Sequence, residues 1–202
     1  MYTLYYQPGA CSLATQVVLH ELKQDVAIID KQQVENFSAI NPIGTVPVLV
    51  DGDKTLREGA ALMIYLLNKH QNSMLPATGA AREQAIQDLM FANATMHPAY
   101  GRLFFIAQHI SDDNAKQSAF DAAALTINQL WQVVEQQLAT HAFLGGDQPS
   151  AADIMLAVYS RWGASFPVAI RLGHNSQKMV AAVQAMPSFQ RAVNAEQQQS
   201  AA

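Results

Sequence analysis

Hydrophobic and polar residues repeat along this chain with two different periods, and the change of period divides the chain into two parts. In the first part, residues 3–6 and 26–29 are short apolar runs typical of strands. Residues 12–23, between them, repeat every three or four positions and predict a helix. A helical crossover of this kind makes the two strands parallel. The apolar face of the helix comprises Leu13, Val17, Val18 and Leu22.

The first part continues with a predicted hairpin and a second helix. Residues 46–50 and 54–57 have the pattern of paired strands around a turn at 51–53, and residues 59–69 that of the helix. The polar stretch at 31–38 has no period, so we expect a loop there with one helical turn at most. The order βαβ followed by ββα predicts a small mixed sheet with helices packed on it.

From residue 80 onward no segment has the pattern of a strand, and the apolar positions recur at helical spacing. Pro98 lies within the first long helix and should kink or break it. Ser150 and Asp153 resemble a capping box before an apolar helix, with Asp in place of the usual Glu. The polar tail from Gln197 is expected to fray. The expected helices cover residues 86–104, 114–140, 150–162, 176–185 and 188–196.

These patterns predict two domains. A mixed α/β domain occupies residues 1–72, and an all-helical domain occupies residues 80–202. The stretch at 73–79 contains Pro76 and Gly79 and has little periodicity, so it is the best candidate for a linker.

Composition narrows the function only broadly. Hydrophobic residues make up 50% of the chain and charged residues 14%, which excludes wholesale disorder. The net charge of -4 argues against general nucleic-acid binding and against an anionic membrane partner. No apolar run reaches the roughly 20 residues that span a bilayer, and we expect no signal peptide. One cysteine excludes an internal disulfide and a multi-cysteine metal site, and it fits a reducing cytosol.

That single cysteine, Cys11, stands where the first strand leads into the first helix. The free N–H groups and the macrodipole at a helix N-terminus favour a thiolate, so we expect the pKa of Cys11 to be lowered. At a pKa of about 8.5 roughly 3% of a thiol is ionised at neutral pH, against roughly three quarters at about 6.5. From its position alone, a small buried apolar side chain is an equally good interpretation of Cys11.

Four motifs occur in a fixed order along the chain. They are Tyr6-Gln7-Pro8-Gly9-Ala10-Cys11-Ser12-Leu13-Ala14, Asn41-Pro42-Ile43-Gly44-Thr45-Val46-Pro47, Glu58-Gly59 and Ser150-Ala151-Ala152-Asp153. Together they resemble the cytosolic glutathione S-transferases, in detail the bacterial beta class, over nearly the whole chain. The resemblance implies a thioredoxin-like βαβ-ββα domain followed by an all-α helical bundle. It also implies a detoxification enzyme that conjugates glutathione to electrophiles or catalyses thiol–disulfide exchange with the help of Cys11.

The resemblance further implies how glutathione is held. A cis-proline at Pro47 would turn the backbone of Val46 toward the cleft, where it would pair with the cysteinyl part like an added β-strand. Glu58 would suit the ammonium of the γ-glutamyl end, and the helix opened by Gly59 would hold its carboxylate. The alternatives are an ordinary trans proline and a solvated first-turn acid.

One segment departs from the beta class. Between residues 29 and 41 the chain is several residues shorter than is usual for that class, and a lysine that contacts the glycyl end of glutathione has no fixed counterpart. Lys31 and Gln33 are both candidates to replace it, and the shorter segment would leave this side of the site more open.

Three residues are implied near the reacting sulfur. Cys11 corresponds to a cysteine that can form a mixed disulfide with glutathione, and without a resolving cysteine it would act as a monothiol. Tyr6 matches a nearby tyrosine, although a role as a packed strand residue is equally good. His97 matches a histidine that reaches the cleft from the helical domain, where it would share a proton with sulfur or bind it. A buried core histidine is the alternative, and Pro98 replaces the lysine that often follows.

The main alternative function is a non-catalytic adaptor of the same fold that binds a protein partner. The intact set of Cys11, Pro47 and Glu58 argues against an adaptor, and the shortened segment argues for one. A maleylacetoacetate isomerase would usually have an arginine in the first helix, which this chain lacks. We therefore expect glutathione as co-substrate, a small electrophile that the sequence does not identify, a homodimer and a cytoplasmic location. We expect no metal, nucleic acid or membrane partner.

Overall fold

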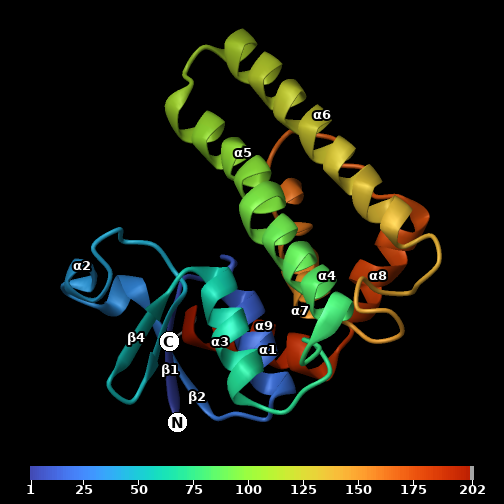
Figure 1. Cartoon of the computed structure of the whole chain (residues 1–202). Helices are drawn as coiled ribbons and strands as arrows, with labels where there is room; N and C mark the ends of the chain where they lie inside the picture. The colour runs from blue at the N-terminus through green and yellow to red at the C-terminus, as the bar shows by residue number, and fades with distance from the viewer. Residues whose placement is uncertain (201–202) are drawn as a thin grey trace. The chain divides into compact units, whose positions relative to one another are not determined.

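The computed structural model describes residues 1–200, which form two compact units (Figure 1). The first unit comprises Met1–Arg82 together with the chain from Gln184 onward, and the second comprises Glu83–Val183. The predicted helical domain at 80–202 ends with Ala201 and Ala202, which lie outside the described residues. The predicted linker at 73–79 stays a prediction, but the contacts group residues 184–200 with the first unit, not with the helical one.

A four-stranded sheet in the order β2-β1-β3-β4 organises the first unit. Its strands are β1 (Tyr2–Tyr6), β2 (Val26–Asp30), β3 (Val48–Asp51) and β4 (Lys54–Arg57). As predicted, β1 and β2 are parallel, and β3 and β4 form an antiparallel hairpin. Helix α1 (Ser12–Glu21) joins the parallel strands, and α3 (Gly59–Lys69) follows the hairpin at its predicted bounds. The two helices pack against each other beside the sheet (Figure 1).

The alternation of side chains along β1 shows which face is the core. Tyr2, Leu4 and Tyr6 are buried, and the intervening Tyr5 points to the other face. There Tyr5 meets Phe37 of the short helix α2 (Phe37–Ile40), with ring centroids 5.7 Å apart. The segment predicted as a loop therefore holds a 3-10 turn, η1 (Lys31–Gln33), as well as the start of α2.

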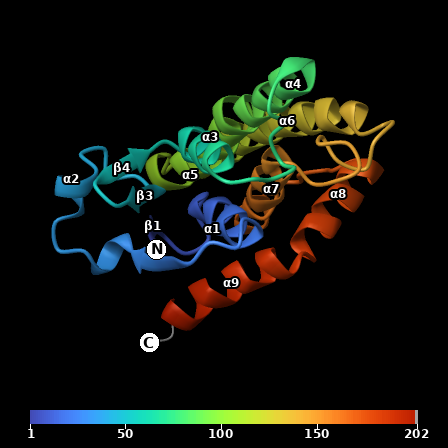
Figure 2. The ribbon, with the colours of Figure 1, turned by 60° about the horizontal axis from the view of Figure 1, so that its bottom comes forward.

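The last helix, α9 (Pro187–Ser200), belongs to the first unit and packs along α1 (Figure 2). The prediction that the tail frays from Gln197 is wrong for residues 197–200, which belong to this helix. The side chain of Gln199 accepts a hydrogen bond from the Tyr6 hydroxyl and donates one to the Ile28 carbonyl. The buried face of α9 comprises Ser188, Phe189, Ala192 and Glu196.

In the described part of the second unit every regular element is helical, and one isolated β-bridge joins Phe143 and Gly146. Helices α5 (His97–His109) and α6 (Asp113–Gln137) run side by side (Figure 1), and the buried Trp131 donates a 2.9 Å hydrogen bond to the Tyr100 hydroxyl. The predicted capping box is confirmed at the start of its helix. The remaining helical elements are α4 (Gly79–Met90), α7 (Ala151–Tyr159), η3 (Trp162–Ser165) and α8 (His174–Gln184).

A π-helical segment, η2 (Phe91–Met96), joins α4 to α5. Proline has no N–H, and its ring clashes with the carbonyl four residues earlier in an α-helix, here that of Ala94. In the wider π turn the N–H of His97 donates to the carbonyl of Ala92, five residues back. The predicted break at Pro98 therefore takes the form of a widened turn directly before His97.

Candidate functional site

Cys11 lies where the chain passes from β1 into α1. After β1 the chain turns at Gly9, whose φ of +71° is a left-handed conformation that glycine adopts without strain. Cys11 follows as the N-cap residue of α1 with helical dihedral angles. This turn directs the thiol of Cys11, a residue of intermediate exposure, to the carbonyl oxygen of Val46, with 3.4 Å between Sγ and O. The first two motifs of the sequence therefore meet at one point.

The turn that carries Val46 has the geometry that the resemblance implies. The peptide bond between Val46 and Pro47 is cis. Asn41, which is buried, holds the turn from within: its Nδ2 donates to the Thr45 carbonyl at 2.8 Å, and its Oδ1 accepts from the Ile43 N–H at 3.3 Å. The backbone of Val46 is therefore presented just ahead of β3 on a turn that its own side chains fix.

Lys31 reaches the same turn from the end of β2. Its Nζ donates to the carbonyl oxygen of Gly44 at 3.1 Å, two residues before Val46. The short segment after β2 thus brings a cation to this end of the site. Gln33 is exposed at the end of η1, so Lys31 is the better placed of the two candidates.

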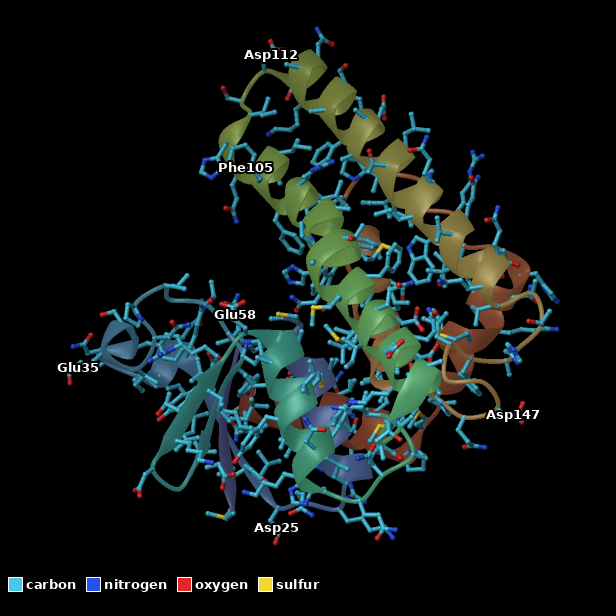
Figure 3. All side chains as sticks on the ribbon, in the orientation of Figure 1. Asp25, Glu35, Glu58, Phe105, Asp112 and Asp147 are labelled. Atoms are coloured by element: carbon cyan, nitrogen blue, oxygen red, sulfur yellow. The ribbon has the colours of Figure 1, made fainter. Side chains whose placement is uncertain are left out.

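Glu58 occupies a strained position at the start of α3, where Figure 3 labels it. Its φ is +72°, a conformation that costs a non-glycine residue about 1–3 kcal/mol and that clusters at ligand sites. The side chain is exposed and makes no capping hydrogen bond, so the carboxylate stands free of the helix that Gly59 opens. A helix N-terminus next to an exposed carboxylate can bind a carboxylate and an ammonium side by side.

The expectation of a lowered pKa for Cys11 is wrong. Burial of the thiol raises its pKa to about 11, and the Glu58 carboxylate adds to the increase. Hydrogen bonds from the backbone N–H groups of Cys11 and Ser12 lower the pKa, as the helix N-terminus predicts, but they do not offset the burial. At a pKa of about 11, roughly one thiol in 10,000 is ionised at pH 7. Cys11 is therefore a hydrogen-bond donor in this structure rather than a thiolate.

Tyr6 does not offer a free hydroxyl. Its side chain is fully buried, and its hydroxyl donates to Oε1 of Gln199 at 3.3 Å. Burial raises the pKa of the phenol, and the carboxylates of Asp30 and Glu196 add to the increase. This arrangement supports the alternative interpretation of Tyr6 as a packed strand residue.

In the second unit, His97 lies in an aromatic cluster. Its ring meets those of Tyr159 and Trp162 edge-on, with centroids 5.2 and 5.3 Å away. Burial lowers its pKa, so the imidazole is neutral at pH 7. A neutral imidazole offers both a donor and an acceptor nitrogen. Trp162 also meets the rings of Tyr100 and Phe104 edge-on.

Sequence reasoning missed Glu196. Its carboxylate is buried and accepts hydrogen bonds from the Gly9 N–H at 2.9 Å and from Nε2 of Gln16 at 2.7 Å. The signal was present in the sequence, because Phe189, Ala192 and Glu196 follow one another at three- and four-residue intervals. An acidic residue on the apolar face of a helix requires a partner.

Residues 1–200 contain neither a metal-binding cluster nor a membrane-spanning helix. No group of three His, Cys, Asp or Glu side chains there is arranged to hold a metal ion. No helix in the same range combines the length and the apolar character that crossing a membrane requires.

Comparison with known proteins places these features in a family. Residues 14–74 match the glutathione S-transferase N-terminal domain, and residues 94–181 match the glutathione S-transferase C-terminal domain. The chain is 31% identical to glutathione S-transferase GST-4.5 of Xanthomonas campestris, over 79% of this chain and 81% of that protein.

Solved structures agree with the sequence matches. A glutathione S-transferase from Xylella fastidiosa superposes with a TM-score of 0.87 at 28% identity, covering 97% of this chain and 98% of the other. A sphingomonad glutathione S-transferase complexed with glutathione gives a TM-score of 0.82 at 26% identity, covering 96% and 98%. A bacterial beta-class enzyme is also among the similar structures. The chain belongs to the glutathione S-transferase family.

Proposed function

We propose that the first unit binds glutathione at Cys11, Val46, Glu58 and Lys31, and that the protein joins the glutathione sulfur to small electrophiles. The protein is a glutathione transferase with glutathione as its co-substrate. The observation that carries the assignment of residues is the contact between the Cys11 thiol and the Val46 carbonyl, beside a cis Pro47.

Each part of glutathione has a suitable partner in this set. The backbone of Val46 pairs with the cysteinyl part, which brings the glutathione sulfur next to Cys11. The Glu58 carboxylate takes the γ-glutamyl ammonium, and the N-terminus of α3 at Gly59 takes the neighbouring carboxylate. The ammonium of Lys31 lies beside the same turn and takes the glycyl carboxylate.

We propose that conjugation, not thiol–disulfide exchange, is the main reaction. In conjugation the glutathione thiol loses its proton to solvent, its sulfur forms a bond to an electrophilic carbon, and a leaving group departs with its electron pair. A protonated Cys11 can donate a hydrogen bond to the attacking thiolate. Exchange instead needs the Cys11 thiolate as nucleophile, and a pKa of about 11 makes that species scarce.

We further propose a homodimer in the cytoplasm, in which His97 acts as a neutral hydrogen-bonding group. The family is the ground for the first two proposals, and the lowered pKa of His97 supports the third. The electrophile stays open, because loops and helical residues of variable shape line such pockets.

Calorimetric titration of the reduced protein with glutathione tests the binding proposal. We expect saturable binding that weakens at least tenfold in Glu58→Gln, because the variant loses a charge-assisted hydrogen bond worth about 1.5–3 kcal/mol. Asp53→Asn, an exposed carboxylate in the β-hairpin turn, is the matched control and should bind like the unmodified protein. If the unmodified protein shows no binding, the proposed site is wrong.

Cys11→Ala separates the two reactions. We expect the variant to lose any exchange with a small disulfide and to keep at least about a hundredth of its conjugation rate, because one hydrogen bond to a charged sulfur is worth about 1.5–3 kcal/mol. Exchange at an unchanged rate in Cys11→Ala would exclude Cys11 as a nucleophile. Loss of conjugation by a thousandfold or more would show that Cys11 does more than donate a hydrogen bond.

A further inference from the structure

The turn before Cys11 is held from both sides. Inside the turn, the Ser12 hydroxyl accepts from the Gln7 N–H at 3.4 Å, and the Ala10 N–H donates to the Gln7 carbonyl at 3.0 Å. Outside it, the Gly9 N–H points at Oε2 of Glu196, which comes from the other end of the chain. These contacts fix the backbone two residues before the thiol.

Glu196 is built into this position rather than lying near it by chance. Its carboxylate is 5% exposed, and its second oxygen, Oε1, accepts from Nε2 of Gln16, which is fully buried in α1. Burying a carboxylate costs free energy unless donors meet it, and here one oxygen serves the turn and the other serves the helix that follows. The carboxylate thereby ties the turn and α1 together on either side of Cys11.

A second residue of α9, Gln199, fixes the position of the helix against the sheet. Gln199 lies one turn beyond Glu196 and bonds both the Tyr6 hydroxyl and the Ile28 carbonyl, at 3.3 and 3.2 Å. The helix is therefore docked against both parallel strands, at Tyr6 where β1 ends and at Ile28 in the middle of β2, and these contacts hold the Glu196 carboxylate in place.

We propose that Glu196 is a positioning residue that holds the Gly9 turn and thereby sets the Cys11 thiol against Val46. It acts through the Gly9 N–H and the Gln16 amide. This inference rests on the proposed function, because the position of Cys11 matters to catalysis only if glutathione binds beside it. A misplacement of the thiol by about 1 Å is enough to change a rate by up to 100-fold.

The test measures the rate at which iodoacetamide alkylates Cys11 at one pH, at a temperature well below unfolding. In Glu196→Ala the turn loses the hydrogen bond from the Gly9 N–H to the carboxylate, so the thiol becomes more accessible. Alkylation should then accelerate about tenfold, the equivalent of one lost charged hydrogen bond. Glu196→Gln keeps an acceptor for the Gly9 N–H and should lie between Glu196→Ala and the unmodified protein.

Two control variants separate positioning from general loosening of the helix. Ala192→Gly weakens α9 one turn earlier without removing a contact to the turn, and should leave alkylation within twofold. Gln197→Ala changes an exposed neighbour of Glu196 and should have no effect. Equal acceleration in Ala192→Gly, or none in Glu196→Ala, overturns the proposal.

A measurement on the unmodified protein covers the case in which the Glu196 variants do not fold. A Gly9 amide held by Glu196 exchanges its hydrogen slowly, and rapid exchange of that amide overturns the proposal. Alkylation needs no glutathione, so failure of the unmodified protein to bind glutathione would overturn the proposed function and leave this result standing. If the unmodified protein binds glutathione but Glu196→Ala does not accelerate alkylation, only the proposed role of Glu196 is overturned.

Discussion

The Cys11 thiol donates a hydrogen bond to the Val46 carbonyl oxygen, with Sγ and O 3.4 Å apart. A carbonyl oxygen has two lone pairs, so it can accept this S–H and still accept an N–H from a bound peptide. A thiolate cannot donate to the carbonyl, so ionisation of Cys11 breaks the contact. The contact therefore works in the same direction as burial, and both keep the proton on Cys11.

Alkylation of Cys11 should increase with pH over an unusually wide range. With a folded pKa of about 11, the rate should rise tenfold per pH unit from pH 7 to pH 10 without levelling off. Stopped-flow alkylation with iodoacetamide measures it, and Cys11→Ala supplies the background rate. A plateau below pH 8 would contradict the raised pKa.

The raised pKa of Cys11 also has a consequence for stability. Since the folded state disfavours the thiolate, the contribution of Cys11 to stability is complete below pH 9 and is lost as pH rises from about 9 to about 11. The thermal unfolding temperature of the unmodified protein should therefore fall more over this pH range than that of Cys11→Ala. Parallel curves would contradict the prediction.

Glu58→Gly should make the protein more stable and its glutathione binding weaker. Glycine adopts the φ of +72° without strain, so the free energy of unfolding should rise by about 1 kcal/mol. Loss of the carboxylate should weaken glutathione binding about tenfold, as for other charged hydrogen bonds. Urea unfolding and calorimetry measure the two effects.

Lys23→Gly is the matched control for Glu58→Gly. Lys23 is the other non-glycine residue with positive φ among the described residues, at +56°, and it lies just beyond α1. The substitution should stabilise the protein in the same way and leave glutathione binding unchanged. If Glu58→Gly binds glutathione normally, the backbone strain at Glu58 has no connection with the ligand.

His97 should make the protein sensitive to mild acid. Because burial lowers its folded pKa below 6.5, the stability that depends on a neutral imidazole is present above pH 6.5 and is lost as pH falls through the folded pKa. Between pH 7 and pH 5 the urea midpoint of the unmodified protein should therefore fall more than that of His97→Gln. His141→Gln, at an exposed position, should behave like the unmodified protein.

Asp153→Ala should be strongly destabilising. The buried carboxylate accepts from the Ser150 N–H and hydroxyl at 2.8 and 2.7 Å and from the Leu144 N–H at 3.0 Å. Leaving these donors unpaired should cost about 2–4 kcal/mol in urea unfolding. Asp112→Ala removes an exposed cap at the start of α6 and should cost about 1 kcal/mol. Equal losses in the two variants would contradict the importance of burial.

Local patterns predicted most of the fold and the outline of the site. The parallel pair of strands, the β-hairpin, the bounds of α3 and the capping box at Ser150 all depend on neighbouring residues, which the sequence displays. The cis bond at Pro47 was implied by the resemblance to the family. The pKa of Cys11 was predicted in the wrong direction, because a helix N-terminus is a local feature and burial is not.

The C-terminal helix was harder to predict for a related reason. Its Gln-rich end looks like a solvated tail, and its contacts reach far back along the chain: Glu196 meets Gly9 across 187 residues, and Gln199 meets Ile28 across 171. Only the single carboxylate at position 196, in line with Phe189 and Ala192, indicated that this face is buried.

The return of α9 to the first unit gives the chain an order of assembly during synthesis. A ribosome releases β1, α1 and the hairpin early, but the helix that packs along α1 emerges only after the second unit. The nascent first unit must therefore expose one face of α1 while the whole second unit is being made. Until α9 has been synthesised, the Gly9 turn lacks the Glu196 carboxylate, so the thiol site cannot be completed before the second unit has been made.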